Sequence, residues 1–247
     1  MKFKVYIPAR YGATRLPGKP LLEIYGKPLI QHVYERARAS GAAEVVIATD
    51  DERILNTAIG FGASACMTSP DHRSGTDRIA EAVQLRDEPA DLVIVNAQGD
   101  EPGIPASVIR QVASLAQSPE CDLATICEPL ESAQLFDANV VKLVRDSNDR
   151  ALYFSRATIP WSRDEFAGGA GVTRALQAYR RHVGIYGFRT DFLARFAAAP
   201  PVRIEELECL EQLRALDFGA CIIAADAVAA CGAGINTRAD LEQVRRA

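Results

Sequence analysis

Short apolar runs alternate with stretches whose apolar residues recur at helical spacing. The runs predict buried strands over Phe3 to Ile7, Val45 to Ala48, Ala63 to Met67 and Leu92 to Val95. The helical stretches carry Leu29, Ile30, Val33 and Ala37, then Ile54, Leu55, Ala58 and Ile59, and a further helix is expected over Thr76 to Leu85. Unbroken apolar strands separated by helices are typical of a mostly parallel sheet covered on both faces. The pattern therefore predicts a doubly wound α/β fold, with ligands beyond the carboxyl ends of the strands.

This alternation becomes irregular after about Leu123. Extended runs at Val140 to Val144 and His182 to Phe188 are separated by turn-rich and glycine-rich segments. We interpret residues 124–189 as a small mixed lobe inserted in the main sheet.

The last part of the chain returns to the regular pattern. Glu205 to Leu216 predicts a helix, and Cys221 to Ala224 predicts a strand of the main sheet. No internal repeat interrupts the sequence. We therefore expect one domain over residues 1–247 that carries the single inserted lobe.

Composition narrows the possible partners. A chain of 247 residues with 48% hydrophobic residues can bury a sizeable core. Its net charge of −4 and the lack of a long Lys/Arg stripe argue against nucleic-acid binding through the phosphate backbone. An anionic ligand must therefore be met by local basic residues.

Cysteine usage and hydropathy indicate the compartment. The six cysteines are scattered without C-x-x-C pairs, and only three histidines are present, so a Cys/His zinc site is not predicted. Free thiols are typical of a reducing cytoplasm. The apolar stretch near the N-terminus is too short for a signal peptide, and no long apolar run follows. We expect a cytoplasmic protein without a membrane partner.

Basic residues gather in the loop that follows the first expected strand. Residues 9–20 contain Arg10, Arg15 and Lys19 together with two glycines. The arginines can fork onto phosphate oxygens, Lys19 can act as a point charge, and glycines let backbone N–H groups approach an anion. A solvated surface loop could carry the same residues. The loop is a candidate phosphate site.

Two common nucleotide motifs do not fit this loop. A Walker A motif needs four residues between its glycines and Ser or Thr after the Lys, whereas five residues separate Gly12 from Gly18 and Pro20 follows Lys19. The dinucleotide fingerprint G-x-G-x-x-G is also absent from the sequence. An NAD-dependent dehydrogenase is therefore disfavoured.

The loop contains the motif R-Y-x-x-T-R-L-P-G-K-P-L at residues 10–21, and six further motifs follow it along the chain. They are ATDDER at 48–53, SGTDR at 74–78, VNAQGDEP at 95–102, ALYFSRATIPW at 151–161, RHVGIYG at 181–187 and LEQLR at 210–214. Together they closely resemble the 3-deoxy-manno-octulosonate cytidylyltransferases, also called CMP-Kdo synthetases. The resemblance covers nearly the whole chain, and an ordered set of motifs is far more specific than any single one.

The resemblance implies a fold and a reaction. The fold is the α/β type of nucleotide-diphospho-sugar transferases with a small dimerisation lobe, and a homodimer is implied with contacts around Val183 to Phe188. The reaction joins CMP from CTP to an acidic eight-carbon sugar for lipopolysaccharide or capsule synthesis. The anomeric 2-hydroxyl would attack the α-phosphorus with Mg²⁺ bound, and pyrophosphate would leave. Positioning and charge neutralisation carry such a reaction, so no nucleophilic side chain is required and none is singled out as a general base.

The resemblance also assigns roles to residues. Arg10, Arg15 and Lys19 would bind phosphate and promote transfer, and Ser74 and Gly75 would bind the cytosine. A lone Asp after a strand is more often a turn or capping residue, but the resemblance makes Asp100 a catalytic Mg²⁺ ligand.

The sugar pocket implied by the resemblance combines one cation with hydrogen-bonding groups. Its members are Gln98, Arg156, His182, Tyr186, Glu211 and Gln212. His182 and Tyr186 are four apart in an expected strand and so share a face.

Three positions depart from the family pattern. Ala13 stands where Ser is usual, which removes a hydroxyl contact. Arg203 stands where small residues or proline are common, which leaves an amino-substituted relative of the sugar open as substrate. Asn236 replaces an aspartate that resembles the second metal ligand, although it could instead cap a helix beginning near Arg238.

Two rival functions are also compatible with the sequence. A cytidylyltransferase for another acidic sugar, such as a sialic or pseudaminic acid, would share the fold and the phosphate loop. The RHVG and LEQLR motifs count against it. A catalytically weak nucleotide-sugar binding protein is suggested by Asn236, while Lys19 and Asp100 argue for an active enzyme.

Overall fold

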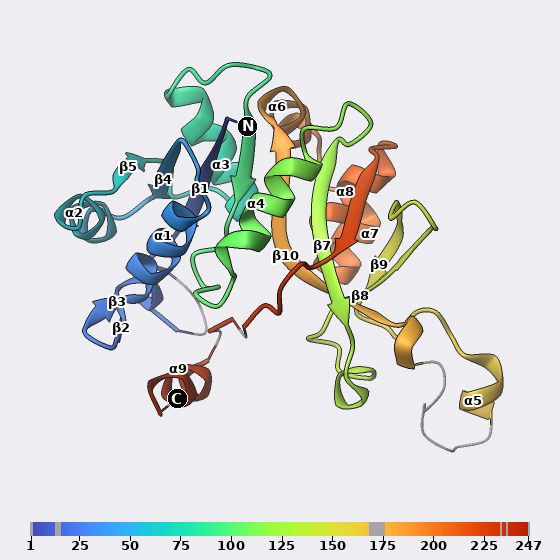
Figure 1. The fold of residues 1–247 in the computed structure, drawn as a ribbon. Helices are drawn as coiled ribbons and strands as arrows, with labels where there is room; N and C mark the ends of the chain where they lie inside the picture. Colours follow the sequence, from blue (N-terminus) through green and yellow to red (C-terminus); the bar gives the residue numbers. More distant parts are fainter. Residues whose placement is uncertain (1, 13–15, 168–175, 233, 236, 247) are drawn as a thin grey trace.

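A central sheet with helices on both faces organises the molecule (Figure 1). The computed structural model describes residues 2–12, 16–167, 176–232, 234–235 and 237–246. Within them the main sheet follows the order β11-β7-β10-β6-β1-β4-β5, with β8 and β9 attached beside β10. Its strands are β1 (Phe3–Ala9), β4 (Glu44–Thr49), β5 (Ser64–Met67), β6 (Val93–Asn96), β7 (Leu123–Pro129), β8 (Lys142–Arg145), β9 (Ala151–Ser155), β10 (Arg180–Arg189) and β11 (Ile222–Asp226). A separate hairpin joins β2 (Glu23–Ile24) to β3 (Lys27–Pro28).

One strand of the main path runs against the others. The strands β4 and β6 pair in parallel with β1, β5 pairs in parallel with β4, and β11 pairs in parallel with β7. By contrast, β10 is antiparallel to both of its neighbours, β6 and β7. The prediction of a mostly parallel α/β sheet is confirmed.

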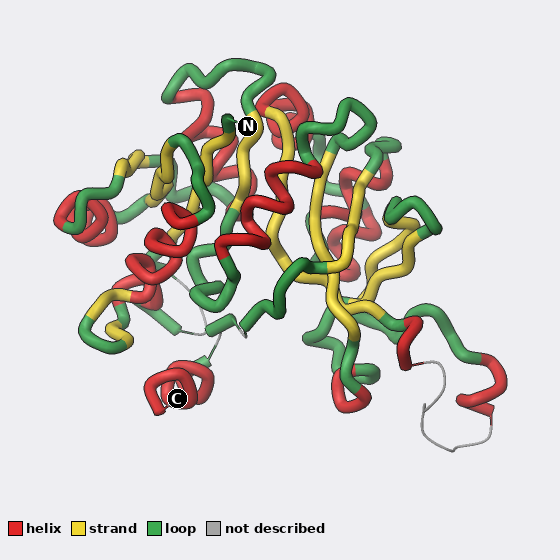
Figure 2. The backbone as a smooth tube through the Cα atoms, viewed as in Figure 1, coloured by secondary structure: helices red, strands yellow, loops and turns green. Residues whose placement is uncertain are grey.

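Helices cover the two faces of this sheet (Figure 2). The helices α1 (Leu29–Ala39), α2 (Glu52–Gly60) and α4 (Ala106–Leu115) share one apolar core, whereas α3 (Gly75–Leu85), α6 (Thr190–Ala198) and α8 (Gln212–Asp217) share the other. Along β1, Val5 and Ile7 face the first core and Tyr6 faces the second, as the two-residue period of a strand requires. The remaining helical elements are α5 (Arg163–Ala167), α7 (Arg203–Glu208), α9 (Arg238–Arg246), η1 (Lys19–Leu21), η2 (Ser132–Gln134) and η3 (Leu176–Ala178).

The expected helix over Glu205 to Leu216 is interrupted. Its first part, α7, ends at Glu208, and Cys209 adopts the left-handed conformation with φ 51°. Such a conformation ends a helix because the chain turns away from the helical path. The chain then turns Leu210, only 7% exposed, into the core before α8 begins. The break places Glu211 and Gln212 at the start of a new helix.

The segment 124–189 supplies both central and peripheral strands. The segment contains β10 and nearly all of β7, which belong to the main path of the sheet, and also β8 and β9, which lie off that path. The division into a main domain and an inserted lobe stays a prediction. A dimer contact through Val183 to Phe188 also stays a prediction, and the apolar side chains of this stretch are at most 6% exposed.

No helix in the described ranges is long and apolar enough to cross a membrane. All six cysteines fall within those ranges and are free thiols, as expected.

Candidate active site

A cleft opens beyond the carboxyl ends of β1 and β6, where the sequence predicts ligand binding. Its volume is about 260 Å³. The phosphate loop, the start of α3 and the loop after β6 supply its walls. They contribute Pro8, Ala9, Arg10, Leu16, Lys19, Pro20, His72, Arg73, Ser74, Gly75, Arg78, Gln98, Gly99 and Asp100.

A salt bridge crosses the cleft between the phosphate loop and the loop after β6. The Nζ atom of Lys19 lies 2.7 Å from Oδ2 of Asp100, and Lys19 is only 8% exposed. Lys19 begins η1 directly after Gly18, whose φ of 71° and N–H bond of 2.9 Å to the Tyr11 carbonyl close the loop. Arg10 is exposed at the wall of the same cleft. Arg15 and Ala13 lie outside the described residues.

The start of α3 lies close to the end of β1. Ser74 caps the helix, because its Oγ accepts the Asp77 N–H at 3.1 Å. A side chain at Gly75 would bring its Cβ to 2.9 Å from Cγ of Pro8. Glycine therefore allows the helix N-terminus, with its free N–H groups, to reach the cleft.

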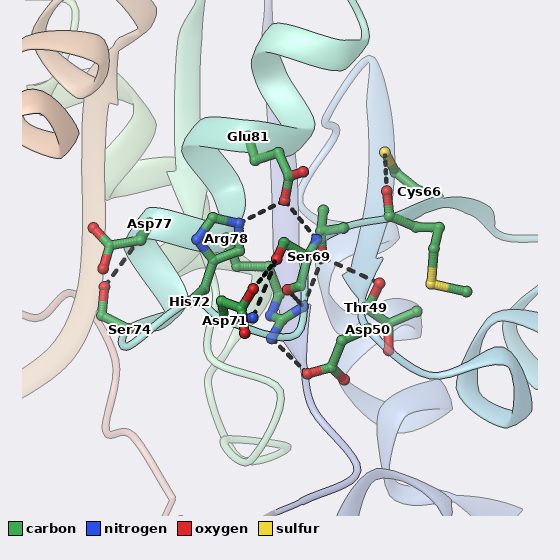
Figure 3. A network of polar contacts seen from close by, with 12 residues as sticks. Thr49, Asp50, Cys66, Ser69, Asp71, His72, Ser74, Asp77, Arg78 and Glu81 are labelled. Atoms are coloured by element: carbon green, nitrogen blue, oxygen red, sulfur yellow. Dashed lines mark hydrogen bonds and ion pairs between the residues drawn. The ribbon is translucent and has the colours of Figure 1, made fainter.

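Hydrogen bonds and ion pairs of charged side chains hold the wall formed by residues 68–74 (Figure 3). Arg78 is 3% exposed and donates to Asp50 Oδ2 at 2.7 Å and to Thr68 Oγ1 at 2.6 Å. Glu81 accepts the Ser69 N–H at 2.7 Å and contacts His72 Nε2 at 2.5 Å. Asp50 lies in the motif ATDDER and Arg78 in the motif SGTDR. No role was predicted for either residue, because the ion pair between them forms only when the chain folds.

Arg73, like His72, lines the cleft and was not expected there. No motif quoted from the sequence includes either residue. Their position directly before SGTDR, at the start of a helix that borders the phosphate loop, is the signal that could have identified them.

A chain of polar side chains leads from the cleft toward α8. Gln98 Nε2 donates to Asn96 Oδ1 at 3.3 Å, and Asn96 Nδ2 donates to Thr76 Oγ1 at 3.2 Å. The Thr76 hydroxyl in turn donates to Glu211 Oε1 at 2.7 Å. Burial raises the pKa of Glu211 above its ordinary value. The chain connects the cleft with two of the predicted sugar residues, Gln98 and Glu211.

His182, Tyr186 and Gln212 form a second polar group beside this chain. Tyr186 donates to Gln212 Oε1 at 3.1 Å, and the His182 and Tyr186 rings are 5.5 Å apart, which confirms that both lie on one face of β10. The Gln212 Nε2 atom is buried and has no hydrogen-bond partner among the described residues. His182 Nε2 lies 3.0 Å from Thr125 Oγ1. Burial, together with the neighbouring charge of Arg181, lowers the pKa of His182 to about 3.

Arg156 is committed to backbone groups. Its guanidinium donates to the carbonyls of Glu208 at 2.6 Å and Ala138 at 2.9 Å. It does not line the 260 Å³ cleft. The structure therefore brings five of the six expected sugar residues into or beside the two polar groups, and the role of Arg156 stays a prediction.

The segment before Asn236 lies against Asp100. Asn236 itself is outside the described residues, but the N–H of Ile235 donates to the Asp100 carbonyl at 2.9 Å. The helix α9 is capped by Thr237, because Asp240 N donates to Thr237 Oγ1 at 3.2 Å and Thr237 N donates to Asp240 Oδ2 at 2.7 Å. The alternative that Asn236 caps this helix concerns a residue outside the described ranges and stays a prediction.

The donor set at this edge suits a hard cation that also binds phosphate. Among the described residues, no group of three or more His, Cys, Asp or Glu side chains could hold a metal by itself. Asp100 presents a partly exposed carboxylate to the cleft, and Mg²⁺ commonly takes only one or two protein carboxylates beside phosphate and water. The residues present fit such an ion.

Comparison with known proteins agrees with this geometry. Residues 5–222 match the family model described as cytidylyltransferase. Two relatives named 3-deoxy-manno-octulosonate cytidylyltransferase are 54% identical over 246 residues in Pseudomonas fluorescens and 51% identical over 249 residues in Nitrosococcus oceani. The alignments cover 99% and 100% of this chain and 97% and 96% of the relatives.

A solved structure gives the same result. It is CMP:2-keto-3-deoxy-manno-octonic acid synthetase complexed with CTP, with 43% identity and a TM-score of 0.88. The match covers 100% of this chain and 98% of the other.

Proposed function

The chain belongs to the 3-deoxy-manno-octulosonate cytidylyltransferase family, and we propose that it transfers CMP from CTP to the 2-hydroxyl of 3-deoxy-manno-octulosonate, releasing pyrophosphate. The observation that carries the proposal is the cleft in which Lys19 and Asp100 meet, continued by the polar chain from Gln98 to Glu211. The charged cleft around Lys19 and Asp100 suits a triphosphate, and the polar chain suits a ligand rich in hydroxyl groups. The product would serve lipopolysaccharide or capsule synthesis.

The phosphate side of the cleft has three assigned functions. Arg10 and Lys19 bind the phosphates, and Lys19 offsets the charge that develops on the departing pyrophosphate. Asp100 is the assigned protein ligand of Mg²⁺, which when bound supplies further charge neutralisation at the phosphates. Ser74 and Gly75 present the start of α3 to the cytosine.

The residues assigned to the sugar orient its nucleophilic hydroxyl. Glu211, which accepts a hydrogen bond from Thr76, and Gln98 form hydrogen bonds with the hydroxyl groups of the sugar. Tyr186 and Gln212 hold another part of the same sugar. In-line placement of the 2-hydroxyl beside the α-phosphorus supplies much of the rate enhancement. No side chain is required as a covalent nucleophile.

Arg203 gives no support to an amino-substituted substrate. Its side chain is 78% exposed and lies 3.6 Å from Glu206 on the same helix. It does not line the cleft. We therefore propose the unsubstituted octulosonate as the substrate.

A substrate panel tests this function. The protein is incubated with Mg²⁺, each of CTP, ATP, GTP and UTP, and each of 3-deoxy-manno-octulosonate, its amino-substituted relative and a sialic acid, while pyrophosphate is measured. We expect release only with CTP and the octulosonate, and none from Asp100→Asn with the same pair. Comparable turnover with ATP, or preference for a sialic acid, would contradict the proposal, and binding without pyrophosphate would favour a nucleotide-sugar binding protein.

We also propose that the protein is a cytoplasmic homodimer. The six free thiols support a reducing compartment. Phe136 and Trp161 are 68% and 65% exposed and both stack on Phe166, which makes the segment around α5 the better candidate for the dimer contact. Sedimentation equilibrium at micromolar concentration should give twice the chain mass, whereas the mass of one chain would refute the dimer.

A further inference from the structure

A partly buried ion pair holds the segment of chain that follows β11. Glu128 on β7 and Arg181 on β10 are directly opposite each other in the antiparallel register. Arg181 Nη2 donates to Glu128 Oε2, and Glu128 is only 8% exposed. The same pair reaches Cys231: Glu128 Oε1 accepts its N–H at 2.6 Å, and Arg181 Nη2 lies 3.5 Å from its carbonyl oxygen. Both backbone groups of Cys231 are therefore bound by one ion pair.

The chain beyond Cys231 runs along the loop that carries Asp100. Gly232 N donates to the Gly103 carbonyl at 3.1 Å, and Ile235, which is fully buried, donates to the Asp100 carbonyl at 2.9 Å. The two backbones touch, because a Cβ placed on Gly103 would lie 2.7 Å from Cα of Gly232. Any displacement of Cys231 would thus be transmitted to the loop after β6.

The pair does not act by contact with substrate. Neither Glu128 nor Arg181 lines the cleft. Burying opposite charges is also a poor source of net stability, since desolvation offsets much of their attraction. An arrangement that binds both the N–H and the carbonyl of one residue does, however, fix the position of that residue.

We propose that Glu128 and Arg181 are positioning residues for the active site. They fix Cys231, so that Gly232 and Ile235 support the Asp100 loop and keep the Asp100 carboxylate opposite Lys19. The catalytic part of this inference rests on the proposed cytidylyl transfer. The structural part, the support of one segment by the other, does not.

Glu128 variants test the proposal, with Glu44→Ala as the matched control. Glu44 also joins two cations, Lys4 at 2.8 Å and Arg86 at 2.6 Å, but near the amino ends of the strands, away from the cleft. Amide hydrogen exchange is measured for peptides covering 231–235 and 100–103, together with kcat and KM for each substrate. Replacing a residue that holds a functional group in position typically lowers activity by about 10- to 100-fold.

We expect Glu128→Ala to speed exchange in both peptides by about tenfold or more and to lower kcat by a similar factor with little change in KM for the sugar. Glu128→Gln, which keeps an acceptor for Cys231 N, should recover part of both. Glu44→Ala should leave exchange in these peptides and kcat at wild-type values.

Two results would overturn the proposal. One is unchanged exchange at 231–235 in a folded Glu128→Ala or Glu128→Gln protein, and the other is an equal loss of kcat in Glu44→Ala. If the wild-type protein released no pyrophosphate at all, the proposed function would fail, but the exchange measurement would still decide whether the ion pair supports the segment.

Discussion

Lys19 and Asp100 face each other across the cleft, with Nζ 2.7 Å from Oδ2, although 81 positions separate them in the sequence. The lysine comes from the loop after β1 and the aspartate from the loop after β6. The two opposite charges lie side by side in the cleft, so phosphate would bind at Lys19 and Mg²⁺ at Asp100. This relationship makes the two residues the first targets for mutation.

Replacing Lys19 with Ala should lower kcat by about 10²- to 10³-fold, since one preorganised charge at a developing anion is worth that much. Stability should change by at most about 1 kcal/mol, because the Asp100 side chain of the pair is 36% exposed. Steady-state pyrophosphate release and thermal unfolding measure the two effects. Lys27→Ala, which breaks an exposed pair with Glu35, is the control and should retain activity. A near-normal kcat in Lys19→Ala would assign residues 9–20 to an ordinary solvated loop.

The double variant Tyr186→Phe with Gln212→Leu should keep its stability and lose affinity for the sugar. It removes both partners of a buried hydrogen bond and also the unpartnered Nε2 of Gln212, so no buried polar group is left alone. We expect KM for the octulosonate to rise by about tenfold or more, which corresponds to the loss of one hydrogen bond of ~1.4 kcal/mol, while KM for CTP stays constant.

The single variant Gln212→Leu is the informative control. It leaves the Tyr186 hydroxyl without its acceptor and should therefore unfold more easily by about 1–3 kcal/mol. An unchanged KM for the sugar in the double variant would remove Tyr186 and Gln212 from the sugar pocket.

His182 should make the protein less stable in mild acid. Its pKa is about 3 in the folded protein and 6.5 ordinarily, so between these values the unfolded chain binds one more proton than the folded chain. The free energy of unfolding then falls as the pH falls below 6.5, by up to ~1.4 kcal/mol per pH unit, and is unaffected by this group at higher pH.

Urea unfolding of the wild type and of His182→Gln at pH 5.5, 6.5 and 7.5 measures this contribution. The stability difference between the two proteins should be constant above pH 7 and should shrink between pH 6.5 and 5.5. Parallel curves down to pH 5.5 would contradict the lowered pKa, because they would mean that His182 binds a proton equally well in the folded and the unfolded protein.

Asn236→Asp should lower the Mg²⁺ concentration needed for half-maximal activity. The amide supplies an oxygen without charge, and the affinity of a hard cation follows the number of anionic ligands. The hydrogen bond from Ile235 to Asp100 brings the preceding residue to the Asp100 loop, which supports this assignment. A gain in kcat is not required, because tighter metal binding can slow release of pyrophosphate.

Mg²⁺ titrations at saturating CTP and sugar compare the variant with the wild type. Unchanged half-saturation together with unchanged thermal stability would place residue 236 outside the metal shell. Thr237→Ala is a useful companion, since loss of the α9 cap should reduce stability by about 1 kcal/mol without altering the Mg²⁺ requirement.

Local patterns predicted much of the fold. The strands β1, β4 and β6 and the helix α3 lie within one or two residues of their expected bounds, because apolar periodicity is a short-range property. The antiparallel placement of β10 between β6 and β7 was not predicted, since strand order depends on contacts between distant segments. The break at Cys209 was missed because the residues around it have ordinary helical propensity and the buried position of Leu210 decides the turn.

The candidate site also contains residues that the sequence predicts and contacts that it does not. The expected residues that line the cleft lie in loops that follow a strand or at the start of a helix, where sequence patterns are informative; they are Arg10, Lys19, Ser74, Gly75, Gln98 and Asp100. The carbonyl partners of Arg156 and the ion pair of Glu128 with Arg181 were not foreseeable, since neither a motif nor a spacing marks a side chain that binds distant backbone.

The contact of Gly232 and Ile235 with the Asp100 loop has a consequence for protein synthesis. Chains leave the ribosome from the amino end, so β1, β4 and β6 can pair and form the phosphate cleft long before residues 222–235 emerge. Only then can β11 join β7 and Ile235 reach Asp100. A nascent chain would therefore acquire its nucleotide cleft early and its catalytic competence only near the end of translation.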